Sequence, residues 1–360
     1  MKRTEITKCI AFLLLFLVLL TGISYAVRMN GDVKDRFVGF YAEKRNTLDA
    51  VLIGSSPVYP AFATPEIYGE QGIAVYPLSS NMQRPKAAVW LTREALKYQD
   101  PALMIYEVRM FTMRDEELLG NMAHTREVTD NLRYSVNRLQ AIRALVEDPD
   151  ERLTYDLDIF KYHSNWKTLA LPSQLKTCFY AWPEGLKGHE PLTDVGPAEG
   201  TLPSAGTDIV PIPEEEEQAL TELCAYLRER ELKALFVVVP HTTKMPETDA
   251  QYRYLSQLVT AQGFAFLNMN DLAETEMGID PDCDFRDYGN HLNAVGAGKL
   301  SGWFGRYLKE QYGLPDHRGD TRYASWDAAY AKWQEEYGRA EQLIGRHVAE
   351  GSYYVVPEEE

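Results

Sequence analysis

The sequence predicts an α/β protein with a mostly parallel sheet, preceded by one membrane-spanning helix. Three observations support this prediction. Short apolar runs alternate with longer segments of helical spacing, which is typical of parallel strands joined by helical crossovers. An apolar stretch follows three basic residues near the N-terminus. The composition is that of a globular protein, with 45% hydrophobic and 25% charged residues among 360.

The N-terminal segment, residues 1–30, is expected to anchor the protein in a membrane. The run CIAFLLLFLVLLTGISYAV at 9–27 is long enough to span a bilayer core. Lys2, Arg3 and Lys8 precede it, which predicts a cytoplasmic N-terminus and a main domain outside the cytoplasm. The alternative is a signal peptide, because Ser24-Tyr25-Ala26 has small residues where cleavage occurs, and the protein would then be secreted.

Residues 31–312 are expected to form the main domain. Its strands are predicted from short apolar runs at 51–53, 73–78, 102–108, 233–239 and 264–268. Its helices are predicted from amphipathic spacing at 34–49, 84–98, 128–146, 214–230, 250–262 and 292–309.

Two further segments interrupt or follow this pattern. Residues 149–212 are rich in Pro, Gly and aromatic residues and are predicted to be an irregular insertion beside the active site. The tail, residues 313–360, contains an amphipathic helical stretch at 326–344 whose aromatic residues are expected to pack on the domain.

Charge and cysteine content exclude some classes of partner. The net charge of −16 argues against nucleic acid and anionic lipid surfaces, since both require clustered Lys and Arg. The spacing of the four cysteines matches no zinc pattern. We expect neither a metal nor a cofactor.

Ser56 is the candidate nucleophile. The apolar run VLIG at 51–54 leads directly into Ser55 and Ser56, and such a loop lies at the carboxyl end of a parallel sheet, where ligands bind. The alternative is a plain strand-to-helix turn in which either serine caps a helix. The Gly-x-Ser-x-Gly elbow is not present, because Val58 occupies the second glycine position.

His291 and Asp287 are the candidate base and its orienting acid. A general base needs a partner that fixes its tautomer, and Asp287, four residues earlier, can reach the imidazole ring. Asp284 is the reserve partner. The alternatives are a turn role for Asp287 with His291 as a helix cap, and a metal site formed by Asp284, Asp287 and His291.

Two other residues are weaker candidates for substrate contact. Arg109 follows the third predicted strand and can bind a polar substrate group, or pair with a carboxylate such as Glu107. His163 lies in the aromatic segment YHSNW at 162–166, where a structural role competes with a functional one.

Four segments carry a resemblance to the SGNH (GDSL) hydrolase superfamily over roughly residues 34–312. They are NTLD at 46–49 leading into VLIGSS, YPLSSNMQRP at 76–85, YHSNW at 162–166, and DFRDYGNHLNAVGAGKL at 284–300. The chain is most similar to the membrane-anchored branch that includes D-alanyl-lipoteichoic acid biosynthesis protein D and the alginate O-acetyltransferase proteins. The resemblance implies a flavodoxin-like three-layer α/β/α sandwich with Ser56 as nucleophile, His291 as base and Asp287 behind it.

The same resemblance implies that the protein is an extracytoplasmic serine acyltransferase or esterase that acts on a cell-envelope polysaccharide. Its implied partners are an acyl donor and a membrane O-acyltransferase. The family's second block supplies a glycine amide to the oxyanion hole, whereas this chain has Ser79-Ser80-Asn81, so Ser55 and Asn81 are the oxyanion candidates. The alternatives are a catalytically weak SGNH-like binding or accessory protein and a structural envelope protein.

Overall fold

The computed structural model describes residues 3–28, 31–119, 122–168, 180–200, 206–242 and 246–356. Its described part contains a five-stranded, fully parallel sheet with strand order β2-β1-β3-β4-β5. The strands are β1 (Ala50–Gly54), β2 (Val75–Ser79), β3 (Leu103–Glu107), β4 (Ala234–Val238) and β5 (Ala265–Asn268). Each lies within the expected run or within one residue of it, so the prediction of an α/β fold with a parallel sheet is confirmed.

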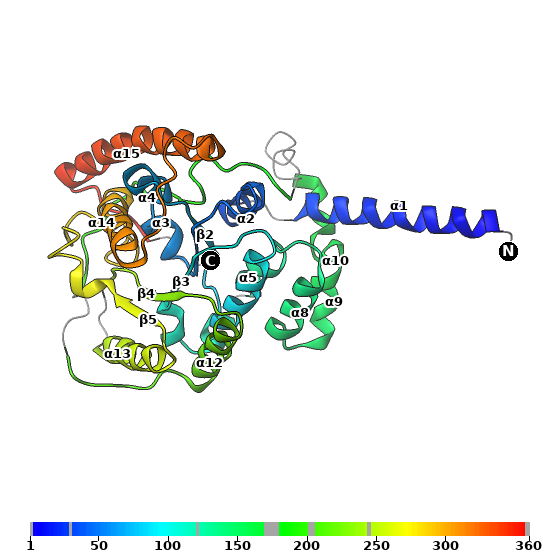
Figure 1. The fold of residues 1–360 in the computed structure, drawn as a ribbon, viewed down its shortest axis with the longest axis horizontal. Coiled ribbons are helices and arrows are strands. Elements are labelled where there is room, and N and C mark those ends of the chain that lie inside the picture. Colours follow the sequence, from blue (N-terminus) through cyan, green and yellow to red (C-terminus); the bar gives the residue numbers. More distant parts are fainter. Residues whose placement is uncertain are drawn as a thin grey trace.

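Helices pack on both faces of this sheet (Figure 1). One core joins alternate strand residues to α2 (Asp32–Ala42), α5 (Ala88–Ala95), α12 (Glu214–Glu229) and α13 (Pro246–Ala261). The other core joins the remaining strand residues to α3 (Val58–Ala61), α4 (Thr64–Gln71) and α14 (Ala294–Tyr312). Burial on both faces explains why β1 to β4 are continuous apolar runs, whereas the edge strand β5 is partly exposed.

Helix α1 (Arg3–Val27) projects from the body of the molecule (Figure 1). It is apolar and long enough to cross a bilayer, although signal sequences and buried core helices share that property. Its last turn is built into the domain: Ser24, Tyr25 and Val27 are buried, and the Tyr25 ring centroid lies 3.9 Å from that of Tyr180.

Three expected helices are shorter or divided. The helix expected at 84–98 is the 3₁₀ helix η1 (Pro85–Ala87) followed by α5, which ends at Ala95. The helix expected at 34–49 ends at Ala42, because the chain becomes extended at Glu43 before it enters β1. The prediction of a single helix at 128–146 was wrong, because the segment forms two helices, α7 (Met122–Thr129) and α8 (Val136–Leu145). Ser135 separates them, because its side chain accepts from the Arg138 amide and caps a new helix.

The insertion expected to be irregular is helical in its first part. It contains α9 (Pro149–Asp156), α10 (Ile159–Tyr162) and the 3₁₀ helix η3 (His163–Thr168), while 169–179 and 201–205 lie outside the described residues. Asp148 caps α9 with Pro149 in its first turn, a start signal that the sequence reading missed. Residues 180–200 run past α2 to the loop before α14, where the Gly196 amide donates to Phe285 O at 3.0 Å.

The tail forms α15 (Ala324–Glu350), a single long helix that packs on α4 and α14. The tail helix expected at 326–344 lies within it. The remaining short elements are η2 (Arg109–Thr112), α6 (Asp115–Leu119), η4 (Met269–Leu272) and η5 (Thr321–Tyr323).

Candidate active site

Ser56 lies just beyond the carboxyl end of β1, in a turn that only glycine can precede. A Cβ atom on Gly54 would lie 2.6 Å from Cβ of Glu107 and 2.7 Å from Cγ2 of Val58. Without that Cβ, β1 approaches β3 closely and the chain turns at once into α3. Ser55 is buried and accepts from the Gln83 amide at 3.1 Å, whereas Ser56 stays half-buried.

A continuous hydrogen-bond chain joins Ser56, His291 and Asp287. Ser56 Oγ lies 3.0 Å from His291 Nε2, and His291 Nδ1 lies 2.7 Å from Asp287 Oδ2. The other carboxylate oxygen of Asp287 accepts from the His291 backbone amide, also at 2.7 Å. Asp287 therefore fixes both the backbone and the ring of His291, and the geometry leaves Nε2 facing the serine hydroxyl.

A tight loop presents the histidine. Phe285 and Leu292 form an antiparallel bridge, and the Arg286 amide donates to His291 O at 2.8 Å. Gly289 has φ of 101°, and a side chain there would collide with Thr242. The cap of α14 is Asn293, which accepts from the amides two and three residues later, so His291 is not the helix cap.

Arg109 holds this loop in place. Its guanidinium donates to Asn290 O at 3.0 Å and also to the Asn290 side-chain oxygen. Asn290 Nδ2 in turn lies 3.1 Å from His291 Nδ1. The structure thus shows Arg109 bracing the residue next to the histidine, with its backbone amide donating to Glu107, and its contact with a substrate stays a prediction.

Asp284 is not an alternative partner of His291. It is fully buried and accepts from Lys299 Nζ at 2.6 Å and from the Asp280 amide at 2.7 Å. It therefore stabilises the start of the loop. Within the described ranges, no three His, Cys, Asp or Glu side chains are grouped as metal ligands, so the suggested Asp284, Asp287 and His291 cluster is wrong.

Asn81 is not free to donate to an oxyanion. Its backbone amide donates to Glu127 Oε2 at 2.8 Å and its side-chain amide to Glu127 Oε1 at 3.1 Å. Its own side-chain oxygen accepts from the Tyr59 hydroxyl at 2.6 Å. Glu127 comes from α7 and carries no sequence signal near Asn81, so this contact could be found only in the structure.

His163 lies apart from this constellation. It begins η3, is exposed, and its Nδ1 lies 3.2 Å from Phe160 O. Its neighbour Asn165 donates to Val27 O at the end of α1. The structure therefore places His163 beside the N-terminal helix, and its contact with a substrate stays a prediction.

Glu107 ends β3 directly behind the serine turn and is buried. The Arg109 amide donates to its Oε1 at 2.8 Å, and burial raises its pKa to about 7. The sequence offered Glu107 only as a partner for Arg109. The structure places it as a carboxyl that gains or loses its proton near neutral pH, packed against Gly54.

This raised pKa predicts a pH-dependent stability that Glu107→Gln removes. Because the folded-state pKa is above the unfolded value of 4.5, the stabilisation is complete below pH 4.5 and is lost as pH rises to about 7. The stability of the native chain relative to the E107Q variant should fall by on the order of 3 kcal/mol across that window. Urea unfolding at several pH values measures it. A difference that does not change with pH would contradict the prediction.

No protein-family model matches the chain, and no curated protein matches it in sequence. A function therefore has to be inferred from the geometry of the described residues. They place a serine, a histidine and a carboxylate in one hydrogen-bond chain at the carboxyl edge of a parallel sheet.

Proposed function

We propose that the chain is an SGNH-type serine acyltransferase or esterase that acts outside the cytoplasm on a cell-envelope polysaccharide. The observation that carries the proposal is the Ser56–His291–Asp287 hydrogen-bond chain. A serine hydroxyl becomes a nucleophile when an adjacent base takes its proton, and the base works when a third group orients it. Here Ser56 is the hydroxyl, His291 is the adjacent base and Asp287 is the group that orients the base.

The position of the triad in the sheet supports the proposal. The order β2-β1-β3-β4-β5 is that of flavodoxin-like sheets, and helices on both faces fit a three-layer α/β/α sandwich. In such sheets ligands bind outside the carboxyl ends of the strands, where the strand order reverses between β1 and β3. Ser56 follows β1 and Arg109 follows β3, at that position.

The acylation step follows from this geometry. Ser56 Oγ attacks the carbonyl carbon of an acyl donor while His291 Nε2 takes the hydroxyl proton, and Asp287 stabilises the resulting imidazolium. The tetrahedral intermediate collapses, the bond to the leaving group breaks, and His291 returns the proton to that group. The product is an acyl ester on Ser56.

The second step releases the acyl group. His291, neutral again, takes a proton from a sugar hydroxyl or from water as its oxygen attacks the ester carbonyl. The Ser56–acyl bond breaks, and the proton passes back to Ser56 Oγ. Transfer to a sugar gives an O-acylated polysaccharide, and transfer to water gives a free acid.

The N-terminal helix supports a location at the membrane. Basic residues before an apolar segment favour a cytoplasmic N-terminus, with the catalytic domain outside. The burial of Ser24 and Tyr25 within the domain favours an uncleaved anchor over a signal peptide, since cleavage after Ala26 would remove these packed side chains.

A fluorophosphonate probe tests the proposed chemistry. It should label the native protein at Ser56, because the probe phosphonylates a serine, with loss of fluoride, when a base activates the hydroxyl. Ser56→Ala should abolish labelling, and so should His291→Ala, which keeps the serine but removes the base. Mass spectrometry of the labelled peptide measures both results. Equal labelling of the folded H291A variant, or labelling at another serine, would contradict the triad.

The second candidate is a catalytically weak binding or accessory protein of a membrane O-acyltransferase system. The contact between Glu127 and Asn81 favours it, because the carboxylate occupies both amide donors next to the site. Losing one oxyanion donor costs about 10²–10³ in rate. A protein that stays unlabelled even after Glu127→Ala would support this second function.

A further inference from the structure

Six of the thirteen exposed large hydrophobic side chains that the structure describes outside α1 lie on one part of the molecule. We call this part the flank and define it as α8, α9, α10 and η3 with their connections, residues 136–168. Its exposed members are Val136, Leu139, Leu153, Leu157, Phe160 and Trp166. Trp166 and Phe160 are 63% and 56% exposed, which is unusual for aromatic side chains on a surface that faces only water.

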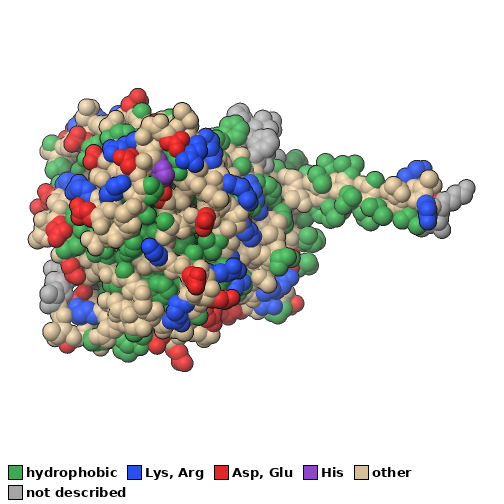
Figure 2. Space-filling view, in the orientation of Figure 1, with side chains coloured by type: hydrophobic (Ala, Val, Ile, Leu, Met, Phe, Trp, Pro, Cys, Tyr) green, Lys and Arg blue, Asp and Glu red, His purple; other side chains and the backbone are tan. Residues whose placement is uncertain are grey.

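The flank lies on the side of the domain from which α1 emerges (Figure 1). α1 contacts both α10 and η3, and Asn165 Nδ2 donates to Val27 O at 3.0 Å. Figure 2 shows hydrophobic side chains at the edge of the body beside the base of α1. The flank thus adjoins the end of the helix proposed to cross the membrane.

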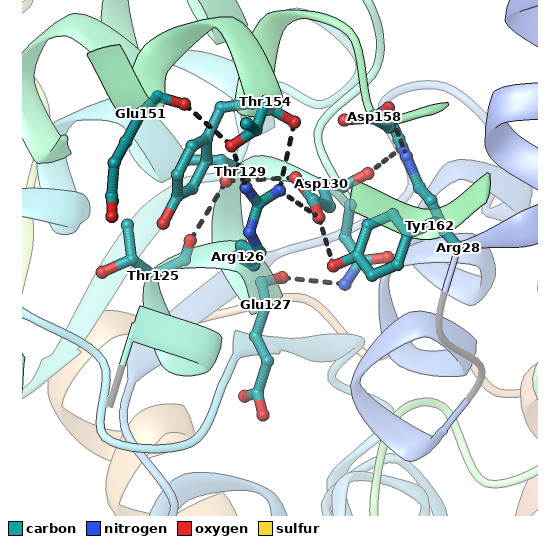
Figure 3. Close-up of polar contacts among 12 residues, drawn as sticks. Arg28, Thr125, Arg126, Glu127, Thr129, Asp130, Glu151, Thr154, Asp158 and Tyr162 are labelled. Carbon is teal, nitrogen blue, oxygen red and sulfur yellow. Dashed lines mark hydrogen bonds and ion pairs between the residues drawn. The ribbon is translucent and has the colours of Figure 1, made fainter. Parts of the chain in front are cut away.

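A buried polar network fixes the flank to α1 (Figure 3). Arg28, the residue after α1, donates from Nε to Asp158 Oδ2 at 2.7 Å and also to the backbone oxygen of Asp130. Arg138 of α8 donates to Asp158 Oδ1 at 2.8 Å, and Tyr162 of α10 donates to Asp130 Oδ2 at 2.7 Å. Because these groups are all buried and hydrogen-bonded, the flank is held in a fixed position relative to the end of α1.

We propose that the flank lies in the outer headgroup region of the bilayer that α1 crosses. Tryptophan is enriched at that level, and apolar helix faces sink into it. The flank, residues 136–168, carries five basic and six acidic residues, although the whole chain has a net charge of −16. The surface is therefore suited to a bilayer by its apolar side chains and needs no anionic lipid. The inference rests on the proposed membrane anchor but not on the proposed chemistry at Ser56.

The proposal has a consequence for the site. A cavity of about 510 Å³ has Arg28, Lys161 and Tyr162 in its lining, and also Tyr59 and Asn81. Tyr59 lies in α3, three residues after Ser56. A flank seated on the bilayer places this cavity at the membrane surface, next to the serine turn.

Tryptophan fluorescence in vesicles tests the inference. The full chain is reconstituted in phosphatidylcholine vesicles whose acyl chains carry bromine close to the headgroup, because bromine quenches tryptophan at contact distance. Quenching of the native protein should be partly lost in Trp166→Phe. The matched control is Trp303→Phe on α14, which should leave the quenched part unchanged. If the W166F variant is quenched as strongly as the native protein, Trp166 is not in the bilayer and the proposal is overturned.

Two further measurements separate the possible failures. Extraction by alkaline carbonate tests the anchor alone: a protein released by carbonate overturns the anchor and the flank together. A protein that resists carbonate but shows no quenching at Trp166 overturns the flank only. If Trp166 is unquenched in these vesicles but a photo-crosslinker at position 166 captures a protein in native membranes, the occupant is a protein and the lipid proposal fails.

Discussion

Asp287→Asn is expected to lower the rate of acyl transfer by about 10⁴, with little change in stability. An asparagine at this position presents an amide N–H to His291 Nδ1, which then has to accept. The ring proton moves to Nε2, and Nε2 no longer accepts from Ser56 Oγ, which lies 3.0 Å away. The turnover of a chromogenic acyl ester by the D287N variant measures the effect.

Asp284→Asn provides the matched control. Asp284 is three residues earlier on the same loop but bonds to Lys299 and to the Asp280 amide. Its replacement should cost about 1–3 kcal/mol of stability, because a charged hydrogen bond is lost, and should leave turnover within a small factor of the native value. Equal losses of turnover in the D284N and D287N variants would show that Asp287 is not the orienting acid.

Asp158→Ala is expected to have the largest effect on stability, about 3–5 kcal/mol. Asp158 is fully buried, and both Arg28 and Arg138 donate to it. Removing the carboxylate leaves both guanidinium groups in the interior with Asp130 as the remaining carboxylate beside Arg138, and this loss of charge compensation costs more than the loss of the hydrogen bonds themselves. The midpoint of urea unfolding, measured on the full chain in detergent, reports the change.

Arg143→Ala is the control for that measurement. Arg143 forms a two-pronged ion pair with Asp156 at 2.9 and 2.7 Å, but its side chain is 48% exposed. An ion pair in contact with water contributes about 0–1 kcal/mol. An R143A variant that is destabilised as much as the D158A variant would show that burial of the network does not decide its contribution.

The sheet was predictable from sequence because β1 to β4 are buried on both faces, while the edge strand β5 is still a short apolar run. Such strands are short apolar runs bounded by polar turns, and all five were located to within about two residues. The contact between Asp287 and His291 was also predictable, because four residues in one turn cannot place them far apart. The contact of His291 with Ser56 required the resemblance as well, since 235 residues separate them.

The polar contacts that join distant segments could not be predicted. Glu127 and Asn81 are 46 residues apart, and Arg28 and Asp158 are 130 apart. Neither pair has a local pattern, because a single charged residue in a helix usually faces water. The division of α7 from α8 was missed for a related reason. In the sequence Ser135 looks like an ordinary helix residue, and only the structure shows that its side chain accepts from the Arg138 amide as the N-cap of α8.

The segment after α15 supports the loop that carries Asp287 and His291, and this support comes from a residue that is synthesised late. The Tyr288 hydroxyl donates to Tyr354 O at 2.7 Å, Arg286 Nη2 donates to the Tyr354 hydroxyl at 3.1 Å, and the Tyr354 amide donates to Val195 O at 2.8 Å. During synthesis Ser56 and His291 leave the ribosome before Tyr354 does. The loop that carries Asp287 and His291 thus gains these last supports only after the tail has been made, so a nascent chain that ends before Tyr354 has an incompletely supported Ser56–His291–Asp287 site.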